Sequence, residues 1–332
     1  MIARLEQQHI FATESGWGEA DIHPLPSDAS FRTYSRLQMG TEKCLLMDAP
    51  PEHENLSAYL TVQAHLERLG LRAPRVYASD IKRGFALIED FGTDTFTQLL
   101  ATGHAAMPLY MQAVDVLVHL HAMGGGADLD VPPYDMAVYL REVNLFTEWF
   151  IPAVYGREVT AAEQTRWQEA WQAVLAPLAS DRSSLVLRDY HVDNLMIIKA
   201  AKGISACGLL DFQDALIGSK AYDLVSLLED ARLDVPDTIR EAALERFFAG
   251  CPDIPRSPFL RDMDILGAQR HAKVAGIFVR LSRRDGKHTY LKHIPRVLHL
   301  LNRCLARAEM LPVRTVLADI APDFAKKTVL KP

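Results

Sequence analysis

The segment from residue 185 to residue 215 restricts the fold of this chain more than any other part of the sequence. Two short apolar runs, LVL and LMII, enclose the polar stretch RDYHVDN, and a third run, GISACGLLDF, follows a KAAKG turn. Short apolar runs separated by turn residues are typical of β-strands. The second and third runs therefore predict a hairpin, and a hairpin here brings Asn194 beside Asp211.

The polar residues at the ends of these runs are of the types that phosphoryl transfer needs. Asp189 and Asn194 are five positions apart, and Asp211 follows the predicted hairpin. In such a reaction one carboxylate orients the acceptor hydroxyl, while oxygen ligands hold Mg²⁺ against the phosphates of a nucleotide. An isolated Asp at the end of a strand is often only a turn former. The combination of loop, hairpin and Asp-Phe favours a catalytic role.

The rest of the chain changes character near residue 91. Before it we predict a short helix over 3–15, a hairpin within 23–48 that turns at Gly40, a helix over 54–69 ended by Gly70, and strands at PRVYA and GFALIED. After it, apolar residues at helical spacing predict helices over 107–123, over 134–155, from a capping box at Thr160 to about 178, and through most of the chain to about 308. We expect an α+β fold with a β-rich N-terminal lobe, 1–91, and a larger, mainly helical lobe, 92–332.

Composition excludes several classes of protein. Apolar residues make up 49% of the 332 residues and charged residues 23%, which excludes disordered and fibrous chains. The net charge of −6 argues against nucleic acid or an anionic membrane as a partner. No apolar run is long enough to span a membrane, and the N-terminus lacks the apolar stretch of a signal peptide, so we expect a cytoplasmic protein. We also expect a monomer. The four widely spaced cysteines suggest reduced, structural thiols.

Three motifs resemble the aminoglycoside phosphotransferase and choline kinase superfamily: Leu-Arg-Asp-Tyr-His-Val-Asp-Asn, Leu-Asp-Phe-Gln-Asp-Ala and Ala-Tyr-Asp-Leu-Val-Ser-Leu-Leu. Its members have a protein-kinase-like fold with two lobes and phosphorylate small-molecule hydroxyls with ATP. A narrower set is similar to the bacterial N-acetylmuramate/N-acetylglucosamine anomeric kinases: SDASFRTY (27–34), LMDAPP (46–51), REVNLFTEWF (141–150) and GIFVRLSRRDGK (276–287). Those enzymes serve cell-wall sugar recycling and make a sugar 1-phosphate, which a uridylyltransferase then converts to the UDP-sugar.

The resemblance implies a role for each matching residue. It makes Asp189 the catalytic base and Asn194 and Asp211 the ligands of Mg²⁺, with Asp223 bracing the catalytic loop. It also implies nucleotide binding by residues of the phosphate turn and of the connector between the lobes; these are Ser27, Ser30, Arg32, Ile88, Glu89 and Phe91.

The chain departs from the superfamily pattern at three places. Leu187 stands where a His usually precedes the catalytic Asp, and Met47 stands about where a nucleotide-binding Lys is expected. The phosphate turn, Ser-Asp-Ala-Ser, has no glycine, although its hydroxyls and backbone N–H groups can still bind phosphate. Arg32 is our candidate for the missing phosphate contact. A kinase-like protein that binds nucleotide without turnover is therefore one alternative.

Candidates for binding the acceptor lie in three further segments. Glu148 and Trp149 pair an acid with an aromatic ring, which suits a sugar as well as a core position, and Asp214 follows the metal motif. Ten Lys and Arg lie between residues 270 and 307, either as a solvated helix face or as a positive surface for an acidic substrate. In that run Arg280 and Arg284 share a helix face and could bind the carboxylate of N-acetylmuramate.

Two alternatives are weighed against this interpretation. An aminoglycoside or choline acceptor needs clustered acids or an aromatic cage, and the basic run argues against both. His119 and His121 are two positions apart on a predicted helix, so they face different sides, and we expect them to pack rather than bind metal.

Overall fold

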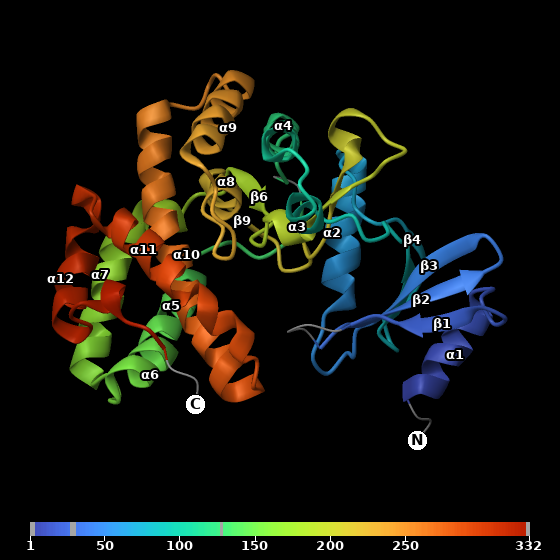
Figure 1. The fold of residues 1–332 in the computed structure, drawn as a ribbon, viewed down its shortest axis with the longest axis horizontal. Coiled ribbons are helices and arrows are strands. Elements are labelled where there is room, and N and C mark those ends of the chain that lie inside the picture. The colour runs from blue at the N-terminus through green and yellow to red at the C-terminus, as the bar shows by residue number, and fades with distance from the viewer. Residues whose placement is uncertain (1–3, 27–30, 127–128, 330–332) are drawn as a thin grey trace. The chain divides into compact units, whose positions relative to one another are not determined.

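The computed structural model of this chain describes residues 4–26, 31–126 and 129–329 (Figure 1). Backbone contacts divide the chain into two compact units, the first containing residues 1–116 and 192–215 and the second residues 117–191 and 216–332. The chain thus leaves the first unit and later returns to it with the segment that carries Asn194 and Asp211. The lobe boundary near residue 91 stays a prediction.

The first unit contains a five-stranded antiparallel sheet in the order β1-β2-β3-β5-β4. Its strands are β1 (Asp21–Pro24), β2 (Thr33–Met39), β3 (Glu42–Asp48), β4 (Val76–Asp80) and β5 (Phe85–Ile88). Strands β2 and β3 pair from Thr33↔Asp48 to Met39↔Glu42. Gly40 has a φ of 60°, which the tight turn requires, so the predicted hairpin is confirmed.

Helices and a second hairpin complete the first unit. They are α1 (Arg4–Glu14), α2 (Leu56–Arg68), α3 (Phe96–Ala101), part of α4 (Ala106–Ala122), β7 (Leu195–Ile197) and β8 (Cys207–Leu209). Phe11 of α1 packs against the buried side chains Leu37, Leu46 and Phe85 of the sheet. The helix predicted over 54–69 is confirmed as α2, with Asn55 as its N-cap.

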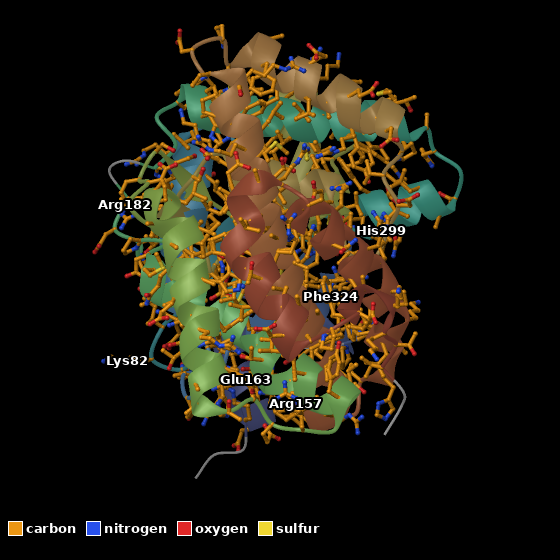
Figure 2. The ribbon with its side chains drawn as sticks, turned by 90° about the vertical axis from the view of Figure 1, so that its left-hand side faces the viewer. Lys82, Arg157, Glu163, Arg182, His299 and Phe324 are labelled. Carbon is orange, nitrogen blue, oxygen red and sulfur yellow. The ribbon has the colours of Figure 1, made fainter. Side chains whose placement is uncertain are left out.

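The second unit is mainly helical. Its helices beyond the rest of α4 are α5 (Met136–Leu145), α6 (Ile151–Tyr155), α7 (Ala161–Ala179), α8 (Ala221–Leu228), α9 (Asp237–Gly250), α10 (Arg256–Asp285), α11 (Ile294–Leu305) and α12 (Leu311–Ile320). The capping box predicted at Thr160 is confirmed, and Glu163 also binds Arg157 at 2.9 Å (Figure 2). The helix predicted over 134–155 contains a π-helical turn, Phe146–Phe150, between α5 and α6.

The structure adds one strand that the sequence did not predict and corrects the extent of another. The LVL run forms β6 (Ser184–Val186), which pairs with β9 (Leu216–Gly218), a strand that the sequence did not predict. The first residues of the GISACGLLDF run, Gly203–Ala206, form a 3₁₀ turn, so only its middle forms β8. Because Gly203 has a φ of 60°, the backbone turns there before the strand can begin.

Helices α5 and α10 approach each other closely at Gly276. A Cβ atom placed on this glycine would lie 2.2 Å from the carbonyl oxygen of Leu145, which no side chain can tolerate. The missing side chain therefore sets the distance between the two helices, and side chains on either side of the contact can reach across.

Candidate active site

The hairpin of β7 and β8 brings two predicted metal ligands together in the first unit. Leu195 pairs with Leu209, and the carbonyl oxygen of Asn194 accepts a hydrogen bond of 2.9 Å from Leu210 N–H. Asp211 follows Leu210 directly and has a φ of 57°, a left-handed conformation that is uncommon for a residue with a side chain. The juxtaposition that the sequence predicts is therefore present.

The Asp211 side chain has one oxygen engaged and one open. Its Oδ1 accepts hydrogen bonds from Arg32 Nη2 at 2.8 Å and from Gln213 Nε2 at 3.0 Å. Within the described residues its Oδ2 has no hydrogen-bond partner, and the side chain is 42% exposed. Carboxylate and amide oxygens are the ligands that Mg²⁺ prefers, so Asp211 with Asn194 fits such an ion.

The residue after Asp211 anchors this segment to α2. The Phe212 ring is buried and stacks on Tyr59, with ring centroids 5.0 Å apart. Asp214, a candidate for acceptor binding, is exposed and accepts a hydrogen bond from Gln213 at 3.2 Å.

The predicted nucleotide residues fall in two segments. Ser27 and Ser30 lie outside the described residues. In the connector, Ile88 is buried in the sheet, and Glu89 N–H is already bound to the Arg75 carbonyl oxygen at 2.8 Å. The Phe91 backbone forms no hydrogen bond with the described residues, so of the three connector residues it has the backbone most available to a nucleobase edge.

The structure also gives the contacts of the residues near the position where the superfamily has its nucleotide-binding lysine. Met47 is fully buried in β3, and Lys43 lies 3.8 Å from Asp90. Arg32, immediately before β2, is buried; besides its contact with Asp211, its Nε lies 3.2 Å from Glu54 Oε2. Of these two cations, Arg32 is the one that the structure shows in contact with the predicted metal ligand Asp211.

In the second unit, Asp223 of α8 holds the backbone before Asp189. Its carboxylate accepts hydrogen bonds from Leu187 N–H at 2.7 Å and Arg188 N–H at 2.9 Å. Burial raises the pKa of Asp223 to about 7, while the two N–H donors oppose that rise. Arg188 has a φ of 69°, and its carbonyl oxygen accepts a hydrogen bond of 2.9 Å from Arg270. This backbone is thus fixed on both sides.

Asp189 remains accessible but lies among positive charges. Its side chain is 40% exposed, and Arg270 Nη1 lies 3.8 Å from its Oδ1. Burial of the carboxyl group alone would raise the pKa of Asp189, but the charges of Lys273 and Arg270 outweigh it and hold the pKa below its usual range. Asp189 is therefore ionised at neutral pH and able to accept a proton.

A buried carboxylate, Glu142 of α5, organises these charges. It accepts hydrogen bonds from Arg188 Nη2 at 2.5 Å and Gln269 Nε2 at 2.8 Å, and also from the Tyr134 hydroxyl. Lys273 Nζ lies 2.9 Å from the same carboxylate. Sequence reasoning did not single out Glu142, although it lies within the REVNLFTEWF motif (141–150).

The candidates for binding the acceptor lie on two elements of the second unit. Glu148 and Trp149 belong to the π-helical turn, where Glu148 is exposed and Trp149 is partly buried. Burial raises the pKa of Glu148, and the charge of Arg280 opposes this. Arg280 is partly buried, and its Nε has no hydrogen-bond partner among the described residues. Arg284 is exposed and bound to Asp285 at 2.7 Å.

The basic run of residues 270–307 is neither a uniformly solvated face nor a free positive surface. Its first two members, Arg270 and Lys273, are buried beside Asp189 and Glu142. Several of the others pair with acids of the same unit: Arg296 with Asp234, Arg303 with Glu229 and Arg307 with Asp264. The local excess of positive charge is therefore much smaller than the sequence suggested.

One further group of side chains has the composition of a metal site. Glu229, His271 and Cys304 are buried together, with His271 Nε2 2.8 Å from Glu229 Oε2. The other oxygen of Glu229 is bound by Arg303 and, at 3.1 Å, by Arg240. Two guanidinium groups oppose a divalent cation, so this cluster is a structural ion pair. We expected His121 to pack rather than to bind a metal ion. It is buried, and its Nδ1 forms a hydrogen bond of 2.9 Å with the Ser184 hydroxyl.

Comparisons with known proteins agree with this arrangement. The model of the phosphotransferase enzyme family matches residues 21–260, and the chain belongs to that family and is a phosphotransferase enzyme. The structure is similar to choline kinase LicA from Streptococcus pneumoniae, with a TM-score of 0.62 and 14% identity, covering 91% of this chain and all of the other. The expected protein-kinase-like fold, with a β-rich lobe and a helical lobe, is thereby confirmed.

The sequence relatives define a narrower group. Over 307 residues the chain is 37% identical to an N-acetylmuramate/N-acetylglucosamine kinase of Pseudomonas aeruginosa, covering 90% of this chain and 88% of the relative. Over 322 residues it is 38% identical to a kinase of the same name from Neisseria meningitidis serogroup B, covering 93% of each chain. Within the described residues, no helix combines the length and apolar character needed to cross a membrane.

Proposed function

We propose that the protein is an ATP- and Mg²⁺-dependent kinase for the anomeric hydroxyl of N-acetylmuramate, N-acetylglucosamine or both, and that it serves the recycling of cell-wall sugars. The observation that carries this proposal is the 37% and 38% identity to kinases named for these two sugars, over 88% and 93% of their lengths. The motifs similar to the anomeric kinases run from Ser27 to Lys287, far beyond the catalytic segment. The product would be a sugar 1-phosphate.

In this proposal Asp189 orients the acceptor hydroxyl and accepts its proton. A hemiacetal hydroxyl is more acidic than an ordinary alcohol, so a carboxylate with a low pKa is a sufficient base if the proton moves late in the reaction. The lowered pKa of Asp189 beside Lys273 and Arg270 supports this role, since the carboxylate stays ionised across the neutral range.

The first unit supplies the candidate residues for metal and nucleotide. Asn194 and Asp211 would hold Mg²⁺, which neutralises charge on the phosphates. Ser27, Ser30 and Arg32 are proposed for the phosphates. The connector residues Ile88, Glu89 and Phe91 are proposed for the nucleobase, and the Phe91 backbone is the best supported of these because it has no partner in the described residues.

The two sugars differ in charge, and this difference leads to a test of acceptor binding. N-acetylmuramate carries a lactyl carboxylate, which an arginine with an available donor can bind. Arg280 has a buried Nε with no hydrogen-bond partner in the part of the chain that the structure describes, whereas Arg284 is already bound to Asp285. We therefore expect Arg280→Ala to weaken kcat/KM for N-acetylmuramate about tenfold more than for N-acetylglucosamine, and Arg284→Ala to affect both sugars little.

The deciding experiment identifies the product. The purified protein is incubated with Mg²⁺, ATP and each sugar, with choline and kanamycin as other acceptors, and release of ADP is measured. Phosphorus NMR then distinguishes a 1-phosphate, which couples to the anomeric proton, from a 6-phosphate. A 6-phosphate product, or turnover only with choline or kanamycin, would overturn the proposed acceptor. Nucleotide binding without turnover of any acceptor would support the alternative of an inactive kinase-like protein.

A further inference from the structure

Arg32 connects three polar side chains around the predicted metal ligand in the first unit. Its Nη2 donates to Asp211 Oδ1 at 2.8 Å, its Nη1 donates to Gln213 Oε1 at 2.5 Å, and its Nε lies 3.2 Å from Glu54 Oε2. The Arg32 side chain is 8% exposed and that of Glu54 is 16% exposed. A guanidinium group offers five N–H donors in one plane, and all three of its nitrogen atoms are engaged here.

The Arg32–Glu54 pair differs in position from the ion pair of a protein kinase. In protein kinases a lysine of the third strand pairs with a glutamate of the following helix. Here the third strand carries the buried Met47, which lies opposite Tyr34 in the sheet register. Arg32 lies two residues before Tyr34, immediately before the neighbouring strand β2, and Glu54 immediately precedes Asn55, the N-cap of α2. Compared with the protein-kinase pair, the cation is thus moved from the third strand to the residue before the second, and the acid is moved to the beginning of the helix.

The contacts of Asp211 show what the displaced pair accomplishes. Arg32 and Gln213 both bind Oδ1, which fixes the rotation of the carboxylate and leaves Oδ2 without a partner in the described residues. The backbone of Asp211 is left-handed, a strained conformation for a residue with a side chain that persists only where surrounding contacts hold it. An open carboxylate oxygen held in one direction is a preorganised ligand for a hard cation.

Glu54 determines the charge of the group. Arg32 and Asp211 alone would form a neutral pair with little attraction for Mg²⁺. With Glu54 the three side chains carry a net charge of −1, because two carboxylates share one guanidinium group. Glu54 therefore neutralises Arg32 and leaves the negative charge of Asp211 available to the metal ion.

We propose that Arg32, Glu54 and Gln213 are positioning residues that hold Asp211 for Mg²⁺, and that the Arg32–Glu54 pair replaces the lysine that the sequence lacks. This inference rests on the proposed role of Asp211 as a metal ligand. The phosphate contact proposed above for Arg32 does not require Glu54, an acid that phosphate would repel, so an effect of Glu54 tests the positioning role separately.

The test measures nucleotide binding rather than turnover. Isothermal titration calorimetry gives the affinity for ADP with and without Mg²⁺ for the wild type, Glu54→Gln and Gln213→Ala. We expect Glu54→Gln to weaken Mg²⁺-ADP binding about tenfold and to leave metal-free ADP binding within twofold, with a smaller loss for Gln213→Ala. Glu52→Gln is the matched control, since Glu52 is exposed two positions away and should bind like the wild type.

Two further variants separate the possible failures. If Asp211→Ala keeps the Mg²⁺ dependence of ADP binding, the metal role of Asp211 in the proposed function is wrong. If Asp211→Ala loses that dependence while Glu54→Gln and Gln213→Ala bind Mg²⁺-ADP like the wild type, only the positioning role is wrong. Should Glu54→Gln fail to fold, Glu54→Asp keeps the charge, shortens the reach to Arg32 and is expected to show an intermediate loss.

Discussion

Replacing Glu142 by glutamine keeps the shape of the side chain and removes the buried charge that Arg188 and Lys273 share. Glutamine can accept from one of these cations only through a neutral oxygen, and its NH₂ group faces donors. Removal of one partner from a buried ion pair usually costs about 3–5 kcal/mol, because the remaining charge is left uncompensated. We therefore expect a large loss of stability in the second unit.

The lowered pKa of Glu142 indicates how this loss should depend on pH. Burial would raise that pKa, but Lys273 and Arg188 lower it from 4.5 to about 2. When folding lowers the pKa of a carboxyl group, the group stabilises the folded state at pH values above its pKa in the unfolded chain. This contribution disappears as the pH falls through the pKa of the group in the folded state. The shift corresponds to about 3 kcal/mol at neutral pH and to about 1 kcal/mol at pH 3.

Urea unfolding followed by tryptophan fluorescence measures this difference. Trp149, Trp167 and Trp171 lie in the same unit as Glu142, so the signal mainly reports on that unit. The control is Glu163→Gln, which breaks a more exposed pair with Arg157 and a helix cap, at a cost of about 1 kcal/mol.

If the free energy of unfolding of Glu142→Gln at pH 7.5 lies within about 1 kcal/mol of that of the wild type, the buried charge is not important for stability as we infer. A deficit that persists undiminished at pH 3 would refute its electrostatic origin.

Three other substitutions test the candidate site. Asp189→Asn should fold normally and lose at least about 10²-fold in turnover, at the low end of general-base effects, and near-normal turnover would remove it from that role. Asp211→Ala should weaken Mg²⁺-nucleotide binding more than sugar binding, since the metal bridges phosphates; calorimetry with unchanged Mg²⁺-ATP affinity would contradict this. Asp223→Asn places an NH₂ donor against one of the N–H groups of Leu187 and Arg188, so we expect a lower melting temperature together with lower activity. An unchanged melting temperature would show that the loop before Asp189 does not depend on both carboxylate oxygens of Asp223.

Local patterns allowed much of the fold to be predicted. The hairpin around Gly40, the helix α2 and the capping box at Thr160 each depend on residues within a few positions of one another. The pairing of Ser184 with Gly218 joins segments far apart in the sequence, and neither strand is long enough to be distinctive by itself. Periodicity therefore predicted β6 and missed its partner.

In the candidate site, too, features set by nearby residues could be predicted and features set by distant residues could not. Asn194 and Asp211 could be placed side by side because only a hairpin separates them. Lys273 was visible only as one cation in a basic run, since its position beside the charge of Asp189 depends on tertiary packing. The left-handed backbone of Arg188 gave no signal either, because such conformations are usually indicated by glycine.

The close contact at Gly276 has a consequence for changing what the enzyme acts on. One helix of 30 residues, α10, carries Arg270 and Lys273 before the glycine and Arg280 after it. Any substitution that moves α10 away from Leu145 would shift all three cations together, so it would change both the surroundings of the proposed base, Asp189, and the proposed acceptor contact, Arg280. Directed evolution toward new sugars should therefore vary side chains after Gly276 and keep the glycine itself unchanged.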